Sequence, residues 1–229
     1  MDGRLVEQTP MRRAVARRMT DSKQQAPHFY VQTEVSMDAL NELLASSEVR
    51  ITATAALVCG CAAALRAEPR FNAVWTDDGL LQADEVNVGV AIALEAGLIA
   101  PALLGADRLD LAGAAAALSD LVERARGGKL RAAEINDATF TLSNLGMFDV
   151  SAFTAIVTPR QVAILATGRA VERLALVDGK PRAVSVLTAT LSADHRAVDG
   201  ADAARFLQAF KGAIEEPRSL TERLEEARS

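Results

Sequence analysis

Histidine is the side chain best suited to move a proton near neutral pH, and this 229-residue sequence contains only two, His28 and His195. His195 follows a long apolar stretch, within the sequence ADHRAVDG at residues 193–200. Charged side chains gather there, between a predicted buried strand and a predicted helix that begins near Asp199. Such a junction is a favoured place for a site, so His195 is the better candidate for a base if this is a histidine-dependent enzyme, although taken alone a histidine in such a loop is more often structural. His28 is expected to be structural.

The two cysteines, Cys59 and Cys61, lie in an uncharged run that predicts a buried helix. Side chains two residues apart on a helix point in different directions. We therefore expect buried apolar residues, with neither a disulfide nor a metal site. This cysteine usage is typical of a reducing, cytoplasmic location.

Composition excludes two classes of function. Lys and Arg number 25 against 30 Asp and Glu, so the net charge is −5, which disfavours a general nucleic-acid binder. The longest uncharged run, residues 51–65, is 15 residues long, whereas a membrane span needs about 20. The N-terminal residues contain no apolar segment typical of a signal peptide, and we expect no membrane association.

The helices and strands that must position these residues follow one another along the chain in an irregular order. Helices are predicted at 10–23, 37–46, 52–68, 109–126 and 199–214. Strands are predicted at 28–35, 71–76, 86–94, 98–103, 139–143, 154–157, 161–167 and 183–192. Because strands and helices do not alternate regularly, the pattern predicts an α+β fold, a two-layer sandwich of a mixed sheet and helices.

The pattern D-H-R-x-x-D-G at residues 194–200 resembles the active-site signature of the dihydrolipoamide acyltransferases, the E2 components of 2-oxoacid dehydrogenase complexes. The stretches 12–35 and 139–170 (TFTLSNLGMFDVSAFTAIVTPRQVAILATGRA) are also similar to the family, most of all to the pyruvate dehydrogenase type. The resemblance covers residues 9–217 and implies a chloramphenicol acetyltransferase-like fold. We thus expect residues 1–229 to form a single catalytic domain with a charged tail at 218–229, without a lipoyl or peripheral-subunit-binding domain.

The resemblance also implies roles for individual residues. His195 would be the base that deprotonates a thiol, which then attacks a thioester directly. Ser143 would donate a hydrogen bond to the oxyanion of the tetrahedral intermediate, although without the resemblance it would be taken as a strand-end residue that bonds backbone. Asp199 would support the site by capping the last helix or by pairing with an arginine, and Arg196 would hold the loop.

The family further implies partners. The acyl group would pass between a dihydrolipoyl group, presented by another domain or protein, and coenzyme A, and 2-oxoacid dehydrogenase subunits are expected partners. The active site would lie between subunits of a homotrimer, so that one copy carries half a site. The highly charged residues 215–229 disfavour docking into an apolar pocket of another trimer, which predicts an isolated trimer of about 73 kDa.

Two features depart from the family pattern and leave alternatives open. The predicted helix around residues 39–44 lacks a cation, and Thr54-Ala55 replaces an Asn-Asp pair, which weakens the case for binding the phosphates of coenzyme A. Arginines at residues 12, 13, 17 and 18 would compensate. The rival hypotheses are an acyltransferase with another acceptor, such as the pantetheine of a carrier protein, and a non-catalytic assembly scaffold. Lys180 is expected in an ordinary hairpin turn.

Overall fold

A mixed sheet of seven strands forms one layer of the molecule. The computed structural model describes residues 3–94, 97–177 and 179–221. The strands follow the order β1-β11-β9-β8-β4-β7, and β10 pairs with the outer part of β11. Pairing is parallel between β8 and both β4 and β9, and antiparallel elsewhere in this sheet. The bounds are β1 His28–Ser36, β4 Val88–Val90, β7 Ala102–Leu103, β8 Phe140–Asn144, β9 Ala163–Thr167, β10 Val171–Val177 and β11 Lys180–Asp194.

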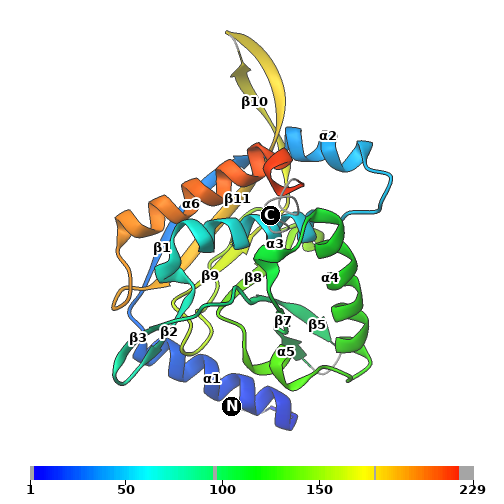
Figure 1. The fold of residues 1–229 in the computed structure, drawn as a ribbon. Helices are drawn as coiled ribbons and strands as arrows, with labels where there is room; N and C mark the ends of the chain where they lie inside the picture. The colour runs from blue at the N-terminus through cyan, green and yellow to red at the C-terminus, as the bar shows by residue number, and fades with distance from the viewer. Residues whose placement is uncertain (1–2, 95–96, 178, 222–229) are drawn as a thin grey trace.

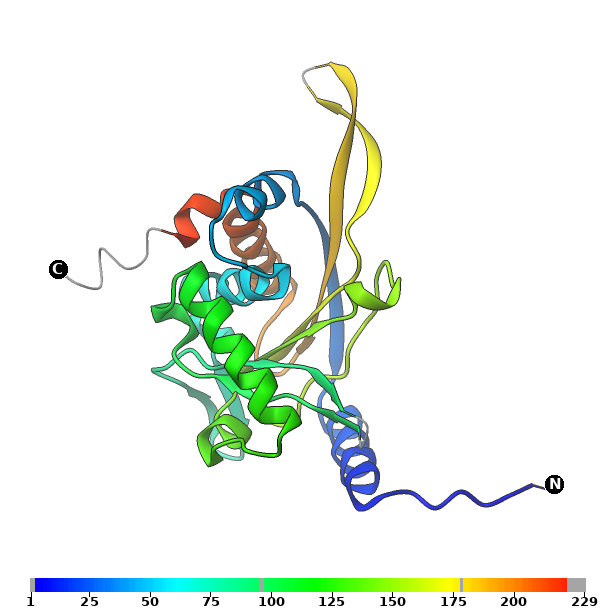
Figure 2. The same ribbon diagram turned by 90° about the vertical axis from the view of Figure 1, so that its right-hand side faces the viewer.

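Helices α2, α3, α4 and α6 cover one face of this sheet and form the second layer, whereas α1 lies beyond one end of the sheet (Figures 1 and 2). Their bounds are α1 Pro10–Gln25, α2 Asp38–Ser46, α3 Ala53–Ala67, α4 Leu111–Arg126, α5 Ala132–Asn136 and α6 Gly200–Glu215. The core lies between α3, α6 and the sheet, where Phe140, Phe206 and Phe210 are fully buried. The predicted α+β sandwich is therefore confirmed. No helix among the described residues is long and apolar enough to cross a membrane.

Side-chain caps begin several helices where the sequence predicts them. Thr9 precedes α1 and accepts a hydrogen bond from the Arg12 N–H, and Thr52 caps α3 in the same way. These hydroxyls satisfy N–H groups that have no partner within a helix. Helix α2 is an exception, because Met37 stands at its N-cap position and makes no side-chain cap.

Two predicted long strands are each broken into two pieces. Residues 86–94 form β4 and β5 (Ile92–Leu94), and residues 98–103 contribute to β6 (Gly97–Ile99) and β7. Strands β4 and β7 join the main sheet, whereas β5 and β6 form a separate two-stranded sheet. Residues 95–96, between β5 and β6 in the sequence, lie outside the described residues. A second small hairpin consists of β2 Ala73–Thr76 and β3 Gly79–Gln82.

The prediction of a strand at 154–157 is wrong. This segment forms no ladder and lies across the ends of other elements, where the Val157 N–H donates to His28 and the Val157 carbonyl accepts from Ser22. Individual side-chain hydrogen bonds thus replace the ladder that its β-branched composition suggested. The strand β10 and the short helix α5 were not predicted.

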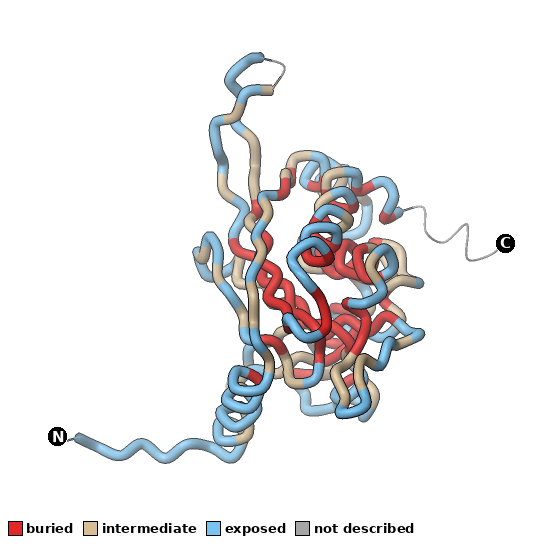
Figure 3. Tube along the Cα trace, turned by 90° about the vertical axis from the view of Figure 1, so that its left-hand side faces the viewer, coloured by how far each residue is buried: buried red, intermediate tan, exposed pale blue. Residues whose placement is uncertain are grey.

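The hairpin of β10 and β11 projects far beyond the body of the protein (Figure 3). Strand β11 is 15 residues long because its first part pairs with β10 and the rest with β1 and β9. Lys180 begins β11 opposite Val177, as expected for an ordinary hairpin, and Asp178 lies outside the described residues. Near the C-terminus, Leu220 is fully buried. Most of the predicted charged tail, residues 222–229, lies outside the described residues.

Candidate active site

The candidate base His195 stands immediately after β11, on an exposed turn. Its backbone N–H donates to the carbonyl of Pro27, and its ring lies 4.6 Å from the ring of Phe29, centroid to centroid. Among the described residues, neither ring nitrogen of His195 has a hydrogen-bond partner. The imidazole is thus anchored by its backbone and by one aromatic contact, while its nitrogens are free to exchange a proton with a substrate.

The residues on either side of His195 form an ion pair that closes the turn. Asp194 is only 1% exposed, and its carboxylate accepts hydrogen bonds from the backbone N–H, Nε and Nη2 of Arg196. The hydrogen bonds to Asp194 raise the pKa of Arg196 above its ordinary value, so the guanidinium stays charged. The guanidinium carbon also lies 4.6 Å from the centre of the Trp75 ring. Arg196 therefore holds the loop, as the sequence suggested.

Asp199 caps helix α6. Its carboxylate accepts hydrogen bonds from the N–H groups of Ala201 and Asp202, and the Asp202 carboxylate accepts in turn from the Asp199 N–H. The N–H groups of Asp202 and Ala201 hold the pKa of Asp199 below its usual range, because both stabilise the ionised carboxylate. Of the two roles expected for Asp199, the structure supports capping, and the arginine that forms an ion pair in this helix, Arg205, binds Asp202.

Ser143 lies near the end of β8 and is half-buried. Within the described part of the chain, its hydroxyl forms no hydrogen bond, which differs from the alternative of a serine bonded to backbone. The next residue is fixed instead: the Asn144 side chain donates to Thr54 Oγ1 at 3.1 Å and accepts from the Gly146 N–H at 2.9 Å. Sequence reasoning singled out Thr54 only as a departure from the family and missed its contact with Asn144.

The structure does not bring Ser143 and His195 together in one chain. Ser143 pairs with Ala166 on β9, and Ala166 pairs with Thr190 on β11, five residues before His195. A rise of about 3.3 Å per residue and about 4.8 Å between strands place the two Cα atoms about 19 Å apart. A hydrogen bond from Ser143 cannot reach an intermediate that forms next to His195 of the same chain.

His28 is structural, as predicted. Its Nδ1 contacts the carbonyl of Ala26 at 2.7 Å, and its Nε2 lies 3.0 Å from the backbone nitrogen of Val157. The second contact requires Nε2 to be the acceptor, so Nδ1 carries the proton and donates to Ala26. Because both nitrogens are engaged, His28 is not available as a base.

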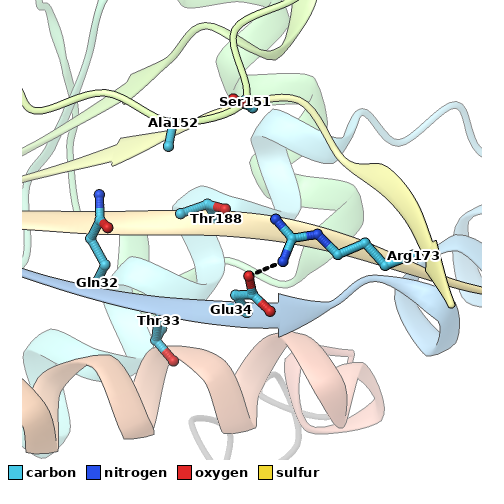
Figure 4. A pocket seen from close by; sticks show the side chains of 7 residues that line it. All are labelled: Gln32, Thr33, Glu34, Ser151, Ala152, Arg173 and Thr188. Carbon is cyan, nitrogen blue, oxygen red and sulfur yellow. Dashed lines mark hydrogen bonds and ion pairs between the residues drawn. The ribbon is translucent and has the colours of Figure 1, made fainter. Parts of the chain in front are cut away.

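A surface cavity lies away from these residues. It has a volume of about 330 Å³ and opens on the sheet face that the helices leave uncovered, near the base of the projecting hairpin (Figure 4). Glu34 and Arg173 form an ion pair across it. Its lining consists of Gln32, Thr33, Glu34, Ser151, Ala152, Arg173 and Thr188, and includes neither His195 nor Ser143.

The chain belongs to the 2-oxoacid dehydrogenase acyltransferase family, because the profile of the family's catalytic domain matches residues 2–222. A curated relative, the dihydrolipoyllysine-residue acetyltransferase component of the pyruvate dehydrogenase complex of Zymomonas mobilis, is 39% identical over 233 residues. That match covers 95% of this chain and 53% of the relative, so the chain spans about half the length of the curated relatives it matches.

Solved structures agree with this assignment. One comes from a crystallographic and enzymatic study of the role of a serine, a histidine and an asparagine in the catalytic mechanism of Azotobacter vinelandii dihydrolipoamide acetyltransferase. It has a TM-score of 0.90 at 29% identity, covering 96% of this chain and 94% of the other. A chloramphenicol acetyltransferase has a TM-score of 0.60 at 14% identity, covering 87% and 92%. The family and the fold expected from the sequence are both confirmed.

Proposed function

We propose that this domain transfers an acyl group between a dihydrolipoyl thioester and the thiol of coenzyme A, with His195 as the general base. The observation that carries the proposal is the difference in hydrogen bonding between the ring nitrogens of the two histidines. Both nitrogens of His28 are engaged by backbone, whereas the nitrogens of His195 lack partners among the described residues and its loop is clamped by Asp194 and Arg196. A base needs this combination of a fixed position and a free nitrogen.

The chemistry follows from the groups involved. Neutral imidazole takes the proton of the attacking thiol, whose ordinary pKa is about 8.5. The sulfur forms a bond to the thioester carbon, and the carbonyl electron pair moves to oxygen, where the Ser143 hydroxyl donates a hydrogen bond. When the oxyanion collapses, the original carbon–sulfur bond breaks and the leaving thiolate takes the proton from the imidazolium. No acyl-enzyme is formed.

The spacing of the candidate residues supports their roles. In the Azotobacter acetyltransferase, 52 residues separate the serine from the histidine, and the asparagine follows the histidine by four. Ser143 and His195 are likewise 52 residues apart, and Asp199 follows His195 by four. This chain therefore has an aspartate where the relative has an asparagine. Both residues are good helix N-caps, which supports a positioning role for Asp199.

We further propose that a site combines His195 of one copy with Ser143 of another, in a homotrimer. The separation of about 19 Å between these residues within one chain supports this arrangement. Exposed apolar side chains also lie on the Ser143 side: Met147 and Phe148 follow it in the chain, and Leu174 and Leu176, 79% and 76% exposed, stand on the projecting hairpin. A second copy would cover them.

Mixing two inactive variants tests the shared site. His195→Ala and Ser143→Ala proteins, denatured together and refolded as an equimolar mixture, should recover about one quarter of wild-type activity, because each intersubunit site draws its two residues from chains chosen at random. The same variants mixed without denaturation provide the control. If the refolded mixture is as inactive as the separate variants, the two residues do not act across subunits. Light scattering should show a trimer of about 73 kDa.

The distribution of cations on the helices bears on which thiol accepts the acyl group, coenzyme A or the pantetheine of a carrier protein. Helix α2 contains Asp38 and Glu42 and no cation, whereas α1 carries exposed arginines at residues 12, 13, 17 and 18. If those arginines bind phosphates, kcat/KM should be at least about tenfold higher for coenzyme A than for pantetheine, which lacks the nucleotide phosphates. Equal values would favour the pantetheine of a carrier protein. Absence of transfer to either acceptor would favour an assembly scaffold.

A further inference from the structure

Trp75, the only tryptophan of the chain, lies against the loop that carries His195, although it is 120 positions away in the sequence. The Arg196 guanidinium stacks over its indole ring at 4.6 Å. Arg196 also binds the buried carboxylate of Asp194 through Nε and Nη2. The guanidinium thus donates from its edge to an anion while one of its faces lies over an aromatic ring.

The position of Trp75 is itself fixed from several directions. It belongs to β2, whose hairpin with β3 lies outside the main sheet. The Trp75 backbone N–H donates to the carbonyl of Arg160 at 2.6 Å, and Val74 forms a bridge with Gln161. Gln161 is buried and hydrogen-bonded to Thr141 on β8. The hairpin therefore presents the indole from a rigid attachment on the sheet.

Arg196 needs such support because its side chain remains 33% exposed, whereas that of Asp194 is 2% exposed. A partly exposed arginine can exchange an ion pair for water and for other rotamers. An aromatic face that covers the guanidinium restricts this exchange, since it removes water from one side and attracts the cation. If Arg196 leaves Asp194, the turn that contains His195 loses its closing interaction.

We propose that Trp75 is a positioning residue for His195, acting through Arg196 and Asp194. The inference rests on the proposed role of His195 as the base. Trp75 contributes no proton and need not touch the substrate. Its indole keeps the guanidinium on the Asp194 carboxylate, and the resulting closed turn keeps the imidazole in line with the reacting thiol. Displacement of a reacting group by about 1 Å can cost up to about a hundredfold in rate.

Steady-state kinetics of two Trp75 variants and one matched control variant test the proposal. Trp75→Leu should lower kcat about tenfold with KM for both thiol substrates unchanged, because the loop is misplaced while the binding surfaces remain. Trp75→Phe retains an aromatic face and should stay within about threefold of wild type. Leu81→Ala changes an exposed residue of the same hairpin and should leave kcat unchanged. Equal losses for the Leu and Phe variants, or a kcat unaffected by either, would overturn the proposal.

Nuclear magnetic resonance gives a readout that does not depend on activity. With ¹³C-labelled histidine, the protein should show two imidazole environments, one for each of its two histidines, His28 and His195. Trp75→Leu should move or broaden the His195 signal and leave the His28 signal in place, and Trp75→Phe should restore the wild-type position. An unchanged His195 signal would refute the positioning role. A shift of His195 in a protein that transfers no acyl group would instead refute the proposed function and leave the structural link intact.

A double-variant cycle checks the route of the effect. Lysine cannot reproduce the forked contact of Arg196 with a carboxylate, so Arg196→Lys already loosens the pair. If Trp75 acts through Arg196, the double variant Trp75→Leu/Arg196→Lys should lose less activity than the product of the two single losses. Fully multiplicative losses would show that Trp75 acts by another route, and would overturn the proposal.

Discussion

The two halves of the proposed site are supported in different ways. The turn around His195 is braced within its own chain by the Asp194–Arg196 pair, the Phe29 ring and the cap of α6. Ser143 has a free hydroxyl among the described residues, and exposed Met147 and Phe148 follow it. Under the proposed function, one chain by itself positions the candidate base His195, whereas the candidate oxyanion donor Ser143 would need a second copy of the chain to complete a site.

The largest expected effect is on the base. His195→Ala should keep the fold, because the ring is exposed, and should lower the rate by about 10²–10⁴, since no other histidine has a free nitrogen. Acetyl transfer followed by absorbance at the thioester band measures this loss, with His28→Gln as the control that should retain kcat. A variant that keeps more than about a tenth of the wild-type rate would contradict the assignment.

Loss of the candidate oxyanion donor, Ser143, should lower the rate less than loss of His195. Ser143→Ala should lower kcat by about 10²–10³ and change KM little, because the hydrogen bond strengthens only as the oxyanion forms. Ser151→Ala, at an exposed serine beyond the same strand, is the matched control. A loss confined to KM would show that Ser143 binds substrate in the ground state instead of the transition state.

The Asp194–Arg196 pair allows an asymmetric test of stability. Arg196→Met should cost about 3–5 kcal/mol of unfolding free energy, because the Asp194 carboxylate stays buried without its partner. Asp194→Asn should cost less, since the arginine left behind is partly exposed and can be solvated. Urea unfolding at neutral pH compares the two variants. The opposite order would mean that the loop opens and hydrates the carboxylate.

The smallest effect is expected at Asp199. Asparagine is an equally good N-cap, so Asp199→Asn should change kcat by less than about threefold. The lowered pKa of Asp199 means that its ionised form stabilises the fold above the unfolded-state pKa of about 3.9, and that this contribution is lost as pH falls through the lower folded-state pKa. Thermal unfolding between pH 2 and 7 should therefore show the wild type losing more stability in acid than the asparagine variant. Parallel curves would contradict the capping role.

Much of the fold could be predicted from local patterns. Thr9, Thr52 and Asp199 stand at the helix starts that the sequence predicts, because a cap depends only on a side chain and the next three residues. Strand 154–157 was predicted wrongly and β10 was missed, because a strand exists only if another segment pairs with it, and pairing is not a local property.

The same division applies to the site. The sequence by itself determined the candidate residues, since only one of the two histidines stands in the D-H-R-x-x-D-G pattern, and the family resemblance of that pattern and of residues 139–170 pointed to Asp199 and Ser143. Only the tertiary structure decided that His28 is saturated by backbone, that Trp75 stacks on Arg196, and that His195 and Ser143 lie about 19 Å apart. The physical reason is that strand order and register set these distances, and both depend on contacts between segments far apart in the chain.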